Sequence, residues 1–105
     1  MEHRWSMRRA LGGEARIYRE GEQAFESEIG DIGLEGIFIR AADVRLQKNT
    51  MVEVEFALPA EPATRYRLPA LVTHKRDEGI GLMFHTFDPR AFRAIQTFLY
   101  ECQGE

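Results

Sequence analysis

The sequence predicts a mainly β fold: a small barrel of six antiparallel strands with one C-terminal α-helix. Three observations point to it, namely short stretches of alternating apolar and polar residues, glycine or proline turns between them, and helical spacing after residue 88. The chain has 105 residues, 44% of them hydrophobic, which suits one compact core and not two. We expect a single domain with a flexible, arginine-rich leader (residues 1–12), a barrel (13–87) and a helix (88–102).

The first half of the chain predicts three strands. Residues 14–19 and 24–29 flank a polar connection at 20–23 that contains a glycine and has the length of a hairpin loop. The segment DIGLEG, residues 31–36, has two glycines and predicts a turn. It leads into a third strand at 37–39, where isoleucines flank a phenylalanine.

The second half predicts three more strands. In residues 50–58, TMVEVEFAL, Glu53 and Glu55 fall on one face, which is the period of a half-buried strand. The opposite, apolar face consists of Val52, Val54, Phe56 and Leu58. After two prolines the alternation resumes over 65–74, where Pro69 predicts a bulge or an edge strand. The segment GIGLMF, residues 79–84, is expected to be the sixth strand, its glycines allowing close backbone approach or a bend.

The end of the chain predicts a helix. Asp88 followed by Pro89 is typical of an N-cap and a first helical residue, because proline has no N–H to leave unpaired there. An apolar stripe with helical spacing follows, and it would lie on the sheet or close one end of it. Its members are Phe92, Ile95, Leu99 and Cys102.

Composition excludes several classes of protein. A formal charge of −3 argues against a protein that coats DNA or RNA, because such domains are usually basic. The lone Cys102 permits no internal disulfide, and no Cys/His spacing suggests a metal site, so we expect a reducing, cytoplasmic setting. Apolar runs are too short for a bilayer span, and the N-terminus lacks the apolar core of a signal peptide, so no membrane insertion is expected.

Residues for catalysis are few, and we predict no enzyme and no catalytic residues. His3, His74 and His85 have no partner in the sequence that marks a triad or a metal pair, and they are assigned no role. The serines, Ser6 and Ser27, lie in no nucleophile-elbow pattern.

Two motifs remain, one basic and one acidic. Arg4 and Arg8 stand four residues apart on the leader, Arg9 is adjacent, and Asp31 begins DIGLEG 22 residues after Arg9. Here the chain resembles a PilZ domain, the bacterial receptor module for cyclic di-GMP, whose pattern is RxxxR followed by [D/N]xSxxG. The resemblance extends over residues 3–18, 31–39 and 72–84 and includes the C-terminal helix.

The resemblance implies cyclic di-GMP as ligand, no cofactor, and binding by Arg4, Arg8, Arg9, Asp31, Gly33 and Gly36. The chemistry agrees, because arginine presents a planar fork that fits phosphate oxygens or the O6/N7 edge of guanine. A carboxylate at Asp31 accepts from guanine N1–H and N2–H₂, and glycines let the backbone approach the base. Trp5 would either stack on a purine or cap the barrel. The arginines would serve one nucleotide or a stacked pair.

The chain departs from the family pattern at Gly33, where the motif has serine. A neutral hydrogen bond is worth about 0.5–1.5 kcal/mol, so the missing hydroxyl predicts affinity weakened by up to about tenfold. Two hypotheses follow. The first is a single-domain cyclic di-GMP receptor whose leader folds over the ligand and signals to an unidentified effector protein, with the family's effects on motility, surface attachment or polysaccharide secretion. The alternative is a degenerate PilZ domain that binds no nucleotide and serves as a protein-interaction module.

Overall fold

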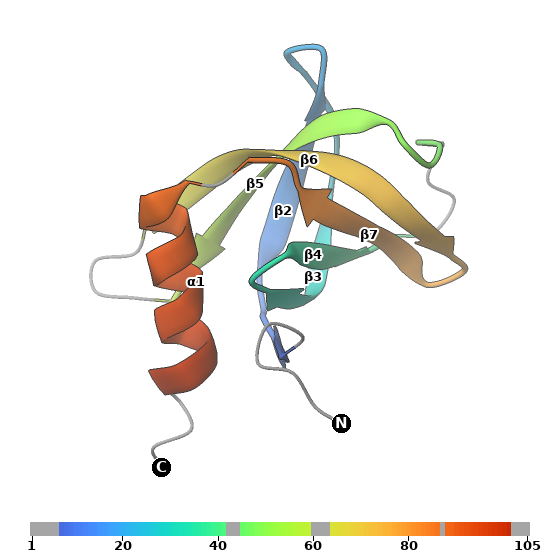
Figure 1. Ribbon diagram of the computed structural model, residues 1–105. Helices are drawn as coiled ribbons and strands as arrows, with labels where there is room; N and C mark the ends of the chain where they lie inside the picture. The colour runs from blue at the N-terminus through green and yellow to red at the C-terminus, as the bar shows by residue number, and fades with distance from the viewer. Residues whose placement is uncertain (1–6, 42–44, 60–63, 87, 102–105) are drawn as a thin grey trace.

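The computed structural model describes residues 7–41, 45–59, 64–86 and 88–101. Within these ranges it contains seven strands and one helix (Figure 1). They are β1 (Arg8–Ala10), β2 (Glu14–Arg19), β3 (Glu22–Gly33), β4 (Gly36–Arg40), β5 (Met51–Leu58), β6 (Thr64–Arg76), β7 (Gly79–Phe84) and α1 (Pro89–Glu101).

Six of the strands close into a barrel. The order β3–β2–β5–β6–β7–β4 is antiparallel throughout, and β4 pairs back with β3. The predicted fold class is therefore confirmed. The short β1 is an addition to this barrel and pairs with the last three residues of β3. It lies along the same edge of β3 as β2, which pairs with earlier residues of that strand, and β4 pairs with the opposite edge.

Part of the segment predicted as a flexible leader is a strand. Residues 1–12 were expected to be flexible, but Arg8–Ala10 forms β1, with Arg8 opposite Gly33 and Ala10 opposite Asp31. The physical reason is the length of β3, which runs beyond the end of β2 and would otherwise leave backbone hydrogen-bonding groups of β3 unpaired. Residues 1–6, which include Arg4 and Trp5, lie outside the described residues.

The expected turn at DIGLEG is also corrected. Asp31 and Gly33 belong to β3, and Gly36 begins β4, so the connection is only residues 34–35. The strand extends because β1 and β4 pair with both of its edges in this stretch. At its other end β3 begins at Glu22, since the hairpin loop is two residues, Glu20 and Gly21, both with the positive φ of a type I′ turn.

The barrel interior is filled by the inward-facing apolar residues of each long strand. The predicted apolar face of β5 is confirmed, since all four of its residues are buried. The largest fully buried side chains are Phe56, Ile17, Ile32, Ile37, Ile39, Ile80, Ile95, Leu99, Val54 and Val72. Among the described residues no polar or charged side chain is buried. Polar chemistry is thus confined to the outer surface.

The helix begins as predicted. The Oδ1 atom of Asp88 accepts hydrogen bonds from the N–H groups of Arg90 at 3.0 Å and Ala91 at 3.2 Å. Ile95 and Leu99 of the predicted stripe are buried, whereas Cys102 lies outside the described residues. The stripe also includes Ala91 and Phe98, both buried, and α1 packs against β3 and β5 at one end of the barrel (Figure 1).

The expectation for Pro69 is wrong. It lies in regular register with Glu53, in a strand that has neighbours on both sides, and the register shift of β6 falls between Val72 and His74. The carbonyl of Pro69 accepts from the N–H of His85 at 2.8 Å. Its missing N–H points the same way, just beyond the last β6–β7 pair, so no ladder bond between β6 and β7 is lost.

Candidate functional site

The two motifs meet in space. Arg8 of β1 donates from Nε to Oδ1 of Asp31 on β3 at 2.6 Å, and its Nη2 donates to the carbonyl of Gly36 at 3.4 Å. The two charged side chains are 41% and 39% exposed. An ion pair this open to water contributes only about 0–1 kcal/mol, so a competing ligand can separate it at little cost.

A bulge turns Asp31 outward. Along β3 the residue Ile29 is buried, and strict alternation would bury Asp31 as well. Gly30 is an extra residue at this point, because Ile29 pairs with Ile39 and Asp31 with the adjacent Phe38. Asp31 therefore lies on the outer face of the barrel, beside Phe38.

Gly33 is the position where the family motif has serine, and β1 lies directly over it. A Cβ atom here would approach the Met7 carbonyl oxygen to 2.9 Å and Arg8 Nη1 to 3.2 Å. The first contact is with backbone, so β1 would have to shift. Gly33 therefore permits the close approach that holds Arg8 beside Asp31. Gly36 is equally restricted, because a Cβ there would collide with the carbonyl of Leu82.

Beside this pair lies a surface hollow of about 450 Å³, which we call the outer hollow. It extends over β3, β4 and β7 to the end of β6, and its lining includes Arg8, Asp31, Glu35, Gly36, Phe38, Thr73, His74, Arg76 and Gly81. Sequence reasoning assigned His74 no role and missed Phe38, Thr73 and Arg76. The signal that places them is strand register, which depends on pairing between segments distant in sequence.

Arg9 does not line the outer hollow, and its expected role in ligand binding stays a prediction. Because side chains alternate along a strand, Arg9 leaves β1 on the opposite face from Arg8. It donates from Nη1 to the carbonyl of Phe98 at 2.8 Å, and its guanidinium lies 4.1 Å from the centroid of the Phe98 ring. That carbonyl is in the last turn of α1, which has no basic residue of its own, so Arg9 caps the helix from outside.

A second hollow, of about 480 Å³, separates the end of β7 from α1. We call it the helix groove. Its walls are mostly apolar, among them Leu34, Phe84 and Phe92, and its charged residues are the carboxylates Glu35 and Asp88, with no arginine or lysine. Its charge is therefore unsuited to phosphate.

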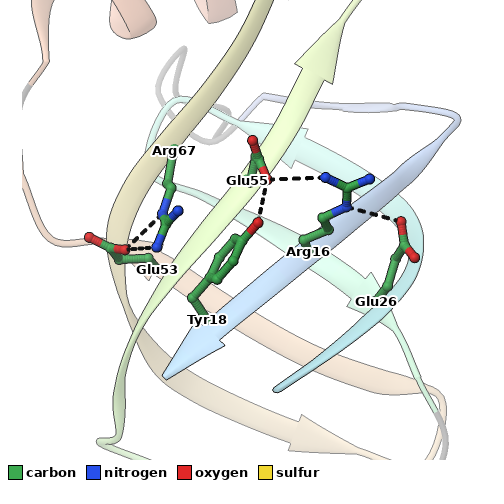
Figure 2. Close-up of polar contacts among 6 residues, drawn as sticks. All are labelled: Arg16, Tyr18, Glu26, Glu53, Glu55 and Arg67. Carbon is green, nitrogen blue, oxygen red and sulfur yellow. Dashed lines mark hydrogen bonds and ion pairs between the residues drawn. The ribbon is translucent and has the colours of Figure 1, made fainter. Parts of the chain in front are cut away.

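A charged cluster also covers the outer face of β2 and β5 (Figure 2). Arg16 binds Glu26 at 3.4 Å and Glu55 at 3.8 Å, and the Tyr18 hydroxyl donates to Glu55 at 2.8 Å. Arg67 binds Glu53 at 2.8 Å and lies over the Tyr18 ring. The hydrogen bond to Glu26 is the chief reason that the pKa of Arg16 is raised above its ordinary value. These charges satisfy one another, which makes the cluster structural.

The described parts of the chain contain neither a cluster of metal ligands nor a membrane-spanning helix. No group of three or more His, Cys, Asp or Glu side chains there is placed to hold a metal ion. No helix there combines the length and the apolar character that a bilayer crossing requires.

Comparison with known proteins agrees with this geometry. The family model described as "PilZ domain" matches residues 2–101. Among solved structures, the PilZ domain of CeSA from a cellulose-synthesizing bacterium is similar, with a TM-score of 0.68 and 12% sequence identity over 93% of this chain and 99% of that one. No curated protein matches the sequence. The family match spans nearly all of the chain, which therefore belongs to the PilZ domain family.

Proposed function

We propose that this PilZ domain is a receptor that binds cyclic di-GMP at the outer hollow and passes the binding event to a separate protein. The observation that carries the proposal is the contact between Arg8 and Asp31, 23 residues apart in sequence, at the edge of a hollow of about 450 Å³ on the outer face. Family membership supports a binding role rather than catalysis.

Each member of this pair suits a different part of a guanine nucleotide. Arg8 offers a charged fork to phosphate oxygens or to guanine O6 and N7. Asp31 accepts from guanine N1–H and N2–H₂. In the free protein the two groups bind each other, and the ligand exchanges one weak, exposed ion pair for two sets of directed hydrogen bonds.

The strand β1 offers a route for the signal. Arg8 faces the outer hollow, while the next residue, Arg9, holds the last turn of α1 through Phe98. A ligand that draws Arg8 away from Asp31 would move β1, a strand of only three residues. This movement would weaken or reorient the contact between Arg9 and Phe98 of α1. The surface altered in this way, around α1, is where an effector protein would detect the bound state.

Isothermal titration of the purified chain with cyclic di-GMP tests the proposal, with GMP as the control ligand. We expect saturable binding that Arg8→Ala removes. The matched control is Arg19→Ala, an exposed arginine at the end of β2 that lies outside the outer hollow and should leave affinity unchanged. Binding unaffected by Arg8→Ala, or absent in the wild-type chain, would contradict the proposal.

The alternative function is a degenerate PilZ domain that acts only through protein contacts. Two observations favour it: Gly33 provides no serine hydroxyl, and Arg8 already has Asp31 and Gly36 as partners. It predicts no heat on titration and no change in melting temperature with nucleotide. The apolar helix groove would then be the first surface to mutate in a search for the partner.

A further inference from the structure

A row of register partners crosses the outer hollow. Asp31 pairs with Phe38, Phe38 with Gly81, and Gly81 with His74, so the row passes through β3, β4, β7 and β6. Neighbouring strands lie about 4.8 Å apart, which makes the row about 14 Å long. A ligand that contacts Asp31 and has two nucleotide units would extend along it toward β6.

A second bulge turns His74 onto this row. Leu68, Ala70 and Val72 are buried at alternate positions of β6, and His74 would be the next inward residue. The register shift between Val72 and His74 inserts Thr73, whose Oγ1 donates to the carbonyl of Gly81 at 3.2 Å. His74 is therefore exposed on the outer face. His74 on β6 and Asp31 on β3 are placed in the same way, because in each strand a bulge brings a polar side chain into the outer hollow.

Between the two ends lies a floor that suits a planar base. Gly81 contributes no side chain, and a Cβ there would come within 3.3 Å of His74 Cδ2. The His74 ring therefore lies against Gly81, and Phe38, the partner of Gly81 on β4, also lines the hollow. Each of these rings provides a stacking surface for a purine.

The far end of the hollow also has a cation. Arg76 is exposed and lies two residues beyond His74 on β6. In the described parts of the chain its guanidinium has no hydrogen-bond or ion-pair partner, unlike Arg8 and Arg9. The outer hollow thus has an arginine at each end, and a cyclic dinucleotide has two phosphates.

We propose that His74 and Arg76 form a second half of the ligand site, which binds the guanylate unit that Arg8 and Asp31 do not hold. The inference rests on the proposed function, and it identifies the residues that would make the site prefer a dinucleotide to a mononucleotide. Arg76 contacts a phosphate or the O6/N7 edge of the second guanine, and the His74 ring, which lies against Gly81, stacks on the base.

The test is titration of Arg76→Ala and of His74→Ala with cyclic di-GMP. We expect each to weaken affinity by roughly tenfold, the loss of one charge-assisted contact or one stacked base. The matched control is Arg65→Ala, an exposed arginine at the opposite end of the same strand, which should bind as the wild type does. A second variant, Gly81→Ala, places a methyl group against the His74 ring without altering charge, displaces that ring and should also weaken binding.

The outcomes separate the two proposals. If Arg8→Ala removes binding while Arg76→Ala, His74→Ala and Gly81→Ala all retain wild-type affinity, the second half-site is overturned and the receptor function stands. If the wild-type chain does not bind, both are overturned. If the β6 and β7 variants weaken cyclic di-GMP while Arg65→Ala does not, the ligand reaches across the barrel face as proposed; thermal melts identify any variant that has merely unfolded.

Discussion

Two rows of register partners cross the outside of this barrel, and they use polar residues in opposite ways. One passes from Glu26 through Arg16 and Glu55 to Arg67, over β3, β2, β5 and β6. The other passes from Asp31 through Phe38 and Gly81 to His74, over β3, β4, β7 and β6. The first row alternates charges between register partners, so opposite charges meet across neighbouring strands (Figure 2). The register shift between β2 and β3 falls beyond this row, between Ile17 and Tyr18.

The second row is interrupted by bulges at both ends, at Gly30 and at Thr73. The bulges bring Asp31 and His74 to a face where the neighbours between them, Phe38 and Gly81, are uncharged. His74 therefore has no charged neighbour within the row, and Asp31 pairs with the exposed Arg8 of β1, which a ligand can displace. Ion pairs between register partners stabilise the first face, and the bulges give the second face its outward polar residues.

The largest expected effect is at the ligand end of the second row. Arg8→Glu replaces the cation opposite Asp31 with a like charge, and we expect cyclic di-GMP affinity to fall by about a hundredfold or more. Unfolding free energy should change by no more than about 1 kcal/mol, because the ion pair is exposed. Calorimetric titration and thermal melting measure the two quantities separately, and an affinity within threefold of wild type would count against the site.

Gly33→Ser restores the serine of the family motif and tests whether close packing or the missing hydroxyl matters more. Because Cβ would meet the Met7 carbonyl at 2.9 Å, we expect β1 to shift and the chain to lose about 1–3 kcal/mol of stability, the usual range for overpacking. Chemical denaturation with and without cyclic di-GMP measures this. Unchanged stability together with tighter binding would show that β1 yields easily and that the hydroxyl dominates.

For the first row we expect a loss of stability without a loss of ligand affinity. Glu55→Ala removes the partner of Arg16 and of the Tyr18 hydroxyl, and Glu55 is only 19% exposed by side chain. Stability should fall by about 1 kcal/mol, while cyclic di-GMP affinity stays at the wild-type value. Denaturation and titration of the same sample check both halves, and a loss of affinity here would mean that the two faces are not independent.

Arg9→Ala has an effect as small as that of Glu55→Ala and distinguishes the roles of the neighbouring arginines of β1. It removes a helix-capping hydrogen bond and a ring contact at Phe98, so we expect a loss of about 1 kcal/mol in stability. Ligand affinity should be nearly unchanged, since Arg9 is on the far side of β1 from the outer hollow. An affinity loss as large as that of Arg8→Glu would place Arg9 in the nucleotide site after all.

Local signals explain what could be predicted from the sequence. The alternation from Val52 to Leu58 depends only on which side of one strand is buried, and the Asp88 cap depends on bonds within three residues. The strand β1, the extension of β3 and the outward turn of His74 depend on pairing with distant segments, and no local pattern specifies a bulge at Thr73. Arg8 and Asp31 could be assigned from a family motif, whereas the contact between Arg9 and Phe98 spans 89 residues.

The most direct test of the central claim, that ligand chemistry belongs to the bulged face alone, is an amide-resolved NMR titration of the wild-type chain with cyclic di-GMP. We expect large shifts at Arg8, Asp31 and Gly33 and again at Gly81 and His74. The amide chemical shifts of the first row should not change on titration; its residues are Glu26, Arg16, Glu55 and Arg67. No shifts at the outer hollow, or shifts concentrated in the first row, would contradict the account.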